Sequence, residues 1–198
     1  MPLWGATDSD ESKPKNLTTA EKKEVFANAS GWVREAGSAA SGNDNTDADP
    51  EVLVAIGELS TSIGAADITE VEMVTTTADK SEGFTISVRV RYNEPVDVVT
   101  TGGTPTLAVT NSNDGTGSGR GPHSLSYASG TGTNELIFSL AIAAANAATN
   151  ADDVLSVGAQ TIALNSGTMK DASGTASDAA RVISGALGTA AGTVTVTA

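Results

Sequence analysis

The feature that most constrains the fold is a strictly alternating segment at residues 84–92. Apolar side chains stand at every second position, and the positions between them are Thr, Ser or Arg; the apolar ones are Phe84, Ile86, Val88, Val90 and Tyr92. Because successive side chains of a β-strand point to opposite faces, this period of two predicts a strand with one face on a core. Such a strand needs partners, so the surrounding chain is expected to be rich in β-structure.

Further strands are predicted where short β-prone runs are separated by Gly, Asn and Asp. Asn93-Glu94-Pro95 is expected to end the first strand, since proline cannot donate to a β-ladder. The Gly- and Asn-rich residues 129–134 predict a hairpin turn. Many short strands with regular turns are typical of a β-sandwich. The expected strands are 69–74, 96–99, 106–110, 125–128, 135–141, 161–165 and 193–196.

Composition excludes several classes of protein. Hydrophobic residues make up 39% of the 198 residues and aromatic ones 4%, so Val, Ile, Leu and Ala have to build the core. There is no cysteine, which removes disulfides and thiolate metal sites and is compatible with a reducing cytoplasm. The net charge of −13 disfavours nucleic acid, because phosphate binding needs a basic surface. No apolar run approaches the ~20 residues of a membrane span, so no membrane partner is expected.

The first quarter of the chain has a different pattern. Residues 1–15 are polar apart from Leu3 and Trp4 and predict an extended arm, with Trp4 either folding back onto its own domain or inserting into a partner. Thr18-Thr19-Ala20-Glu21 predicts a capping box. A short helix is expected to follow through Glu24, Val25 and Phe26 and to end before Ser30-Gly31.

Two strands are expected after that helix. Trp32-Val33-Arg34-Glu35 predicts the first. Residues 51–56 fit a strand, or a helix with Asp49 as N-cap and Pro50 in its first turn; a strand paired with the Trp32 segment is favoured. The predicted fold is therefore mainly β, with an extended arm and a small α/β N-terminal subdomain over 1–66 followed by a β-sandwich over 67–198.

The β-rich part carries an ordered series of short phrases. They are Tyr92-Asn93-Glu94-Pro95-Val96, Gly103-Thr104-Pro105-Thr106-Leu107, and the segments 127–138 and 164–174. In this order and spacing they resemble the bacterial immunoglobulin-like repeats of surface adhesins and of tailed-phage virion proteins. The resemblance covers about 69–198 and implies an immunoglobulin-like β-sandwich.

A second resemblance covers the start of the chain. Met1-Pro2-Leu3-Trp4-Gly5, Lys13-Pro14-Lys15 and Pro50-Glu51-Val52-Leu53-Val54-Ala55 are similar to the opening of virion structural proteins from T4-like phages of marine cyanobacteria. This implies a non-enzymatic virion protein assembled in the host cytoplasm. Capsid decoration is the role it favours, with the major capsid protein as the expected partner. A neck, tail, baseplate or fibre protein, a host-surface adhesin, and a homo-oligomer are the alternatives left open.

The residues expected to contact a partner lie in the N-terminal region. Large apolar and aromatic side chains are favoured at the centres of interfaces. On this ground the candidate interface residues are Leu3, Trp4, Phe26 and Trp32.

Residues with catalytic or metal-binding chemistry are few. His123, the single histidine, is expected to be an exposed loop residue outside any Ser-His-Asp arrangement. The Gly-rich segment 115–121 lacks the Lys-Ser/Thr end of a phosphate loop and predicts a flexible connection.

Residues 43–49 alternate oxygen donors as a calcium loop does, but Val54 stands at the twelfth position, where a Glu is required, so a solvated loop is favoured. Asp152-Asp153 and Asp171 are further possible calcium donors with the same reservation. No catalytic, cofactor-binding or metal-ligating residue is named, and no cofactor is expected.

Overall fold

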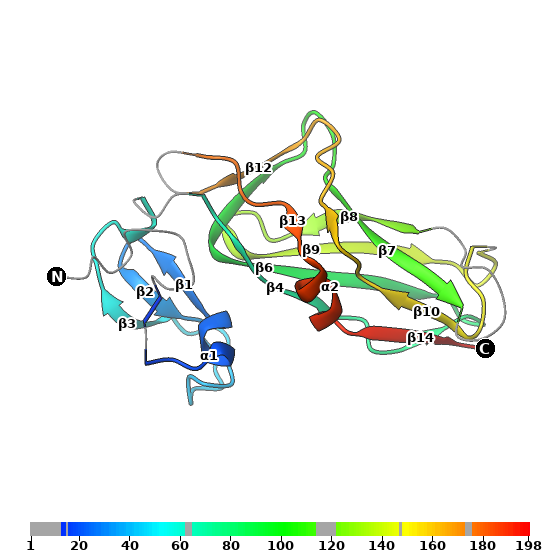
Figure 1. The fold of residues 1–198 in the computed structure, drawn as a ribbon, viewed down its shortest axis with the longest axis horizontal. Helices are drawn as coiled ribbons and strands as arrows, with labels where there is room; N and C mark the ends of the chain where they lie inside the picture. The colour runs from blue at the N-terminus through cyan, green and yellow to red at the C-terminus, as the bar shows by residue number, and fades with distance from the viewer. Residues whose placement is uncertain (1–12, 15, 62–64, 114–121, 147, 173–175) are drawn as a thin grey trace.

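The computed structural model describes residues 13–14, 16–61, 65–113, 122–146, 148–172 and 176–198. The fold is mainly β, as predicted. Figure 1 shows an elongated molecule, with the N-terminal elements at one end and the C-terminus at the other. The N-terminal elements are α1 (Thr19–Lys23), β1 (Val25–Asn28), β2 (Gly31–Arg34), β3 (Glu51–Ala55) and the 3-10 turn η2 (Leu59–Thr61). The remaining elements are β4 (Ile68–Met73), β5 (Ala78–Asp79), β6 (Phe84–Val99), β7 (Thr106–Asn113), β8 (His123–Ser129), β9 (Thr133–Ile142), β10 (Asp153–Ser156), β11 (Gln160–Thr161), β12 (Thr168–Asp171), β13 (Val182–Ile183), α2 (Gly185–Ala190) and β14 (Thr193–Thr197).

Residues 67–198, called the β module here, are organised around one curled sheet. Its strand order is β12-β6-β9-β8-β7-β10-β14-β5, and β4 pairs with β6 outside this path. Buried side chains from most of these strands meet in a single apolar core, which includes Ile86, Leu107, Leu125, Phe138 and Leu155. A sandwich-like β fold is therefore confirmed, while the immunoglobulin-like assignment stays a prediction.

Strand β6 shows the alternation predicted for residues 84–92. Ile86, Val88, Val90 and Tyr92 are fully buried. The expectation that Asn93-Glu94-Pro95 ends the strand is wrong, since β6 continues to Val99. The pairing of β6 with β9 is irregular between Arg91 and Val96, and from Val96 to Val99 β6 pairs with β12. Pro95 therefore lies where the β6–β9 ladder is interrupted, and its missing N–H breaks no hydrogen bond of that ladder.

The helix of the N-terminal subdomain is shorter than predicted. The capping box is present, with the Thr18 hydroxyl accepting from the Glu21 backbone N–H at 3.2 Å and the Glu21 carboxylate accepting from the Thr18 N–H at 2.8 Å. The helix nevertheless ends at Lys23, and Val25 and Phe26 belong to β1 rather than to the helix. These β-prone residues gain a full antiparallel pairing with β2, which outweighs continuation of the helix.

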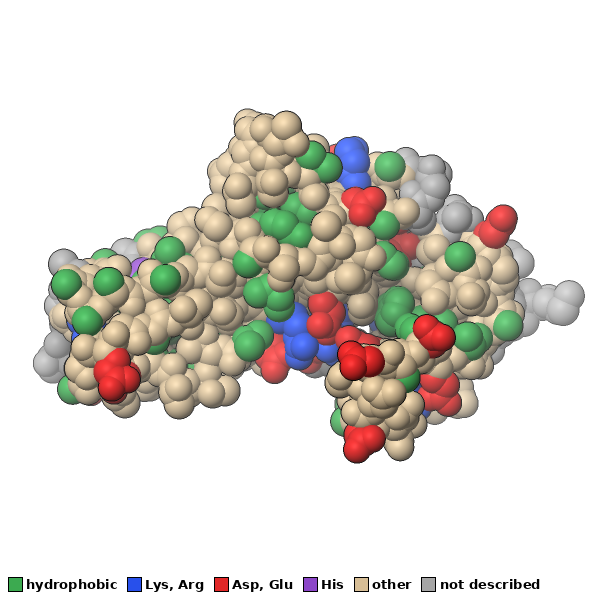
Figure 2. Space-filling model, turned by 180° about the vertical axis from the view of Figure 1, so that it is seen from behind, with side chains coloured by type: hydrophobic (Ala, Val, Ile, Leu, Met, Phe, Trp, Pro, Cys, Tyr) green, Lys and Arg blue, Asp and Glu red, His purple; other side chains and the backbone are tan. Residues whose placement is uncertain are grey.

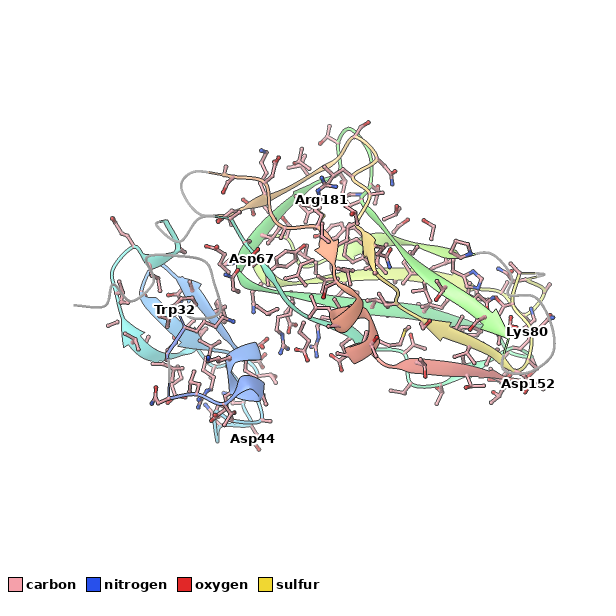
Figure 3. The ribbon with its side chains drawn as sticks, in the orientation of Figure 1. Trp32, Asp44, Asp67, Lys80, Asp152 and Arg181 are labelled. Carbon is pink, nitrogen blue, oxygen red and sulfur yellow. The ribbon has the colours of Figure 1, made fainter. Side chains whose placement is uncertain are left out.

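Within segment 51–56, residues Glu51–Ala55 form strand β3, so the favoured strand is confirmed over the helix. β3 pairs antiparallel with β2 and gives a three-stranded sheet of order β1-β2-β3. One face of this sheet has its own small core of Val25, Ala27, Trp32 and Leu59, separate from the core of the β module. In Figure 3 the labelled Trp32 lies within this N-terminal sheet.

Other strand predictions are met to different degrees. The strands expected at 69–74, 106–110, 125–128, 135–141 and 193–196 are confirmed, and the hairpin turn at 129–134 joins β8 to β9. Gly130 and Gly132 adopt positive φ there. The strand expected at 161–165 is reduced to the two residues of β11 and an isolated bridge from Ala163 to Thr106. Strands β5, β10, β12 and β13 and helix α2 were not predicted. Among the described residues, no helix is both long and apolar enough to cross a bilayer.

Candidate functional site

The most distinctive polar site lies where the N-terminal sheet meets the β module. β1 contacts β6, and Figure 2 shows a hollow between the two parts in which basic and acidic side chains meet. A cavity of about 350 Å³ opens here, and we call it the junction cleft. Its charged lining residues are Glu24, Glu35, Glu70, Glu72, Arg89 and Arg91, and Ala36, Gly37, Ser38, Ala39 and Thr46 complete it.

The charges of the β module reach this cleft because of strand register. Arg89 and Arg91 lie on the face of β6 opposite its buried apolar residues. Glu72 stands directly across from Arg89 on β4, and Glu135 stands across from Arg91 on β9. Opposite charges on facing positions of neighbouring strands attract, so the sheet itself aligns the cluster.

Arg91 is the centre of this cluster. Its Nη1 lies 3.1 Å from Glu70 Oε2, and its Nε donates to Glu135 Oε1 at 2.8 Å. Arg89 lies 3.4 Å from Glu135 Oε2 through Nη1 and also pairs with Glu72. The Arg91 side chain is only 10% exposed, compared with 30% for Arg89. Arg91 is therefore a largely desolvated cation held by carboxylates.

The N-terminal subdomain adds one carboxylate to the cluster. Glu35 follows β2, and its Oε2 lies 3.2 Å from Arg91 Nη2. Burial raises the pKa of Glu35, opposed by the attraction of Arg91 and reinforced by the nearby Glu135. Arg91 therefore links the two parts of the molecule, although Glu35 is costly to ionise there.

A buried cross-strand pair lies on the second face of the N-terminal hairpin. Phe26 and Val33 face each other in the β1–β2 register, on the side of the hairpin opposite Val25 and Ala27. Phe26 is 8% exposed and Val33 fully buried, although neither belongs to the small N-terminal core. Since β1 lies against β6, we infer that this second face is covered by the β module.

The four predicted interface residues have different positions. Leu3 and Trp4 lie outside the described residues. Trp32 is completely buried in the N-terminal core, and Phe26 is buried as described above. Both side chains are buried in the folded chain, and their contact with a partner stays a prediction.

His123 is placed differently from the prediction. It is the first residue of β8, it is 5% exposed, and it is not an exposed loop residue. Thr149 Oγ1 lies 2.9 Å from its Nε2, and Asn111 Nδ2 lies 3.3 Å from the same atom. The Gly- and Pro-rich residues before it suggested a loop, but the alternation His123, Leu125, Tyr127 already carried the signal of a strand.

Of the remaining sequence candidates, Thr46 lines the junction cleft and Asp153 is buried near His123. Residues 43–49 form exposed turns in which Asn43 Oδ1 accepts from the Asn45 N–H and Asn45 Oδ1 from the Asp47 N–H. The Gly-rich segment 115–121 lies outside the described residues. Within the described ranges, no three His, Asp or Glu side chains come close enough to share a metal ion.

Sequence reasoning did not identify the charged residues of the cleft. Arg89 and Arg91 were recognised only as the polar positions of an alternating strand. A usable signal was present, because Glu70 and Glu72 also alternate on a predicted strand, and opposite charges on two alternating strands favour pairing. Glu35 gave no such signal, since its approach to Arg91 depends on how two separate cores pack.

Comparisons with protein-family models, with curated proteins and with solved structures find no match for this chain. No relative therefore supplies a function for it.

Proposed function

We propose that this chain is a non-enzymatic structural protein of a phage particle, attached through its N-terminal region and presenting the β module. The observation that carries the proposal is the presence of two separately packed cores joined at one ion-paired junction. Such an arrangement suits a protein in which one part binds the particle and the other is held at a defined orientation. The resemblances of both parts to virion proteins point the same way.

The chemistry of the described residues supports a structural role. The junction cleft holds carboxylates and guanidinium groups that form ion pairs with one another. Each contact in a repeated particle lattice can be modest, because many copies act together. Capsid decoration, with the major capsid protein as partner, is the position we favour on the particle.

Deleting residues 1–15 tests the attachment. Particles assembled with the truncated chain are expected to lack it, while circular dichroism of the purified chain keeps its β signal. The control is Val182→Ser, an exposed position of the β module, which is expected to be incorporated normally because that side chain is 66% exposed. Incorporation of the truncated chain at the wild-type copy number would contradict the proposal. A high copy number in wild-type particles would favour the capsid, and a low one the neck or baseplate.

A further inference from the structure

The end of the β module far from the N-terminal subdomain is closed by buried polar residues. Asn111, His123, Thr149 and Asp153 are each at most 5% exposed. In Figure 3, Asp152, the neighbour of Asp153, is labelled at this end, close to Lys80. Buried polar side chains generally need hydrogen-bond partners, and four of them lie in this one region.

Strand register brings three of these residues onto the same inner face. Val109 pairs with His123, and Asn111 pairs with Leu155. Asn111 is two residues beyond Val109, and Asp153 is two residues before Leu155, so both share the inner face of these buried aliphatic residues. They form a polar layer directly above the apolar core.

Two oxygen atoms of this layer have no hydrogen-bond partner among the described residues. They are Asn111 Oδ1 and Asp153 Oδ1. The other polar atoms are engaged: Asn111 Nδ2 donates to Ala148 O at 2.6 Å, and Asp153 Oδ2 accepts from the Asn150 N–H at 2.7 Å. The orientation of the Asn111 amide follows from this, since the reverse would place two oxygens in contact.

The Asp153 side chain is completely buried, and none of the ion pairs between described residues includes it. A buried carboxylate with one N–H donor calls for a positive charge close to its free oxygen.

We propose that Asn111 Oδ1 and Asp153 Oδ1 bind a divalent cation of the calcium type. A carboxylate and an amide oxygen are hard ligands, which Ca²⁺ prefers, and water can complete its shell. The only ring nitrogen shown to face this layer, His123 Nε2, is already contacted by Thr149 Oγ1, so the layer does not offer the nitrogen ligands that zinc prefers. Of the two adjacent aspartates, the structure selects Asp153, because Asp152 is exposed.

The test uses the full chain purified in EGTA. Thermal unfolding is expected to show a rise in Tm of about 5 to 10 °C at a calcium concentration 100-fold above the Kd. Asp153→Asn is expected to abolish this rise. Asp152→Asn removes the same charge from the adjacent exposed position and is expected to keep it. Isothermal titration calorimetry of the wild-type chain is expected to show one Ca²⁺ per chain, and this measurement does not depend on whether a variant folds.

Three outcomes would overturn the proposal. Calcium could leave the wild-type Tm unchanged and produce no binding heat. Asp153→Asn and Asp152→Asn could both keep the calcium-induced rise in Tm, which would place the cation away from both residues. Asp152→Asn could abolish the calcium effect while Asp153→Asn keeps it, which would place the cation on the surface. None of these outcomes depends on attachment to a particle.

Discussion

Arg91 forms ion pairs with three carboxylates, which come from three different parts of the chain. Glu70 belongs to β4, Glu135 to β9, and Glu35 to the segment that follows β2. A buried ion pair often adds little net stability, because desolvation offsets the attraction. Removing one partner is different, since the charges that remain have lost their solvent without a replacement. Removing Arg91 alone is therefore expected to lower the free energy of unfolding by more than its ion pairs add to it.

This difference predicts unequal effects of two matched substitutions. Arg91→Met is expected to lower the free energy of unfolding by about 3 kcal/mol, because it leaves three carboxylates without their shared cation. Arg89→Met is expected to cost about 1 kcal/mol or less, since Arg89 is more exposed and its partner Glu72 is 45% exposed. Urea denaturation of the two variants and the wild type measures the difference. Equal losses would show that Arg91 has no special position in the cluster.

His123 predicts a pH dependence of stability. Burial lowers its pKa in the folded chain from the ordinary 6.5, partly opposed by the nearby Asp153. Below pH 6.5 the unfolded chain therefore binds a proton that the folded chain does not. The free energy of unfolding is expected to fall as the pH drops below 6.5, and the loss is complete once the pH passes the folded pKa.

The control for this effect is His123→Gln, whose amide can also accept from Thr149 Oγ1. Urea denaturation of both proteins at several values between pH 7.5 and 5.5 gives their slopes. The difference between the slopes isolates His123, because Glu35 and all other carboxylates titrate in both proteins. Identical slopes would contradict the prediction.

At the scale of single elements, the strands with a clear period of two could be predicted and the rest could not. In residues 84–92 the alternation of apolar residues predicts which side chains are buried, because the apolar positions face the core. The continuation of β6 through Pro95 could not be foreseen, since it depends on a pairing irregularity with β9. The start of β1 at Val25 depends likewise on β2 as a partner. The buried polar layer could not be predicted either, because Asn111, His123 and Asp153 meet only through strand register.

The first residue of β2 allows a prediction at this scale. Gly31 has φ +133°, and a Cβ there would lie 2.0 Å from Val54 O on the neighbouring β3. Gly31→Ala is therefore expected to separate β3 from the hairpin and to cost more than about 2 kcal/mol. Gly57→Ala is the control in the same subdomain, because its Cβ would meet no atom within 4 Å and its φ is not positive.

Fluorescence of Trp32 reports this change in a Trp4→Phe background. Denaturation of Gly31→Ala is expected to begin at lower urea than in the parent, whereas Gly57→Ala is expected to follow the parent. A Gly31→Ala curve that coincides with the parent would show that the hairpin can adjust without cost.

At the scale of the whole molecule, two cores of unequal size share one chain. The core of the β module draws on most of its strands, while the N-terminal core rests on Val25, Ala27, Trp32 and Leu59. The junction between them includes the Glu35–Arg91 ion pair, and we infer that the Phe26–Val33 face packs there as well. A junction that is partly polar allows the smaller unit to unfold while the larger one remains folded.

Trp32→Ala tests this independence. Replacing a fully buried Trp by Ala costs about 3 to 5 kcal/mol, which is a large share of what so small a core can supply. Hydrogen exchange is expected to show lost protection in 17–59 and retained protection in β6, β8 and β9. The matched variant Leu125→Ala, in the core of the β module, is expected to reduce protection in the β module first.

If the chain is attached through its N-terminal region, Trp32→Ala also fails to enter particles while its β module stays folded. Loss of protection throughout the chain in Trp32→Ala would instead show that the two cores unfold as one unit, and that attachment and display cannot be separated by mutation.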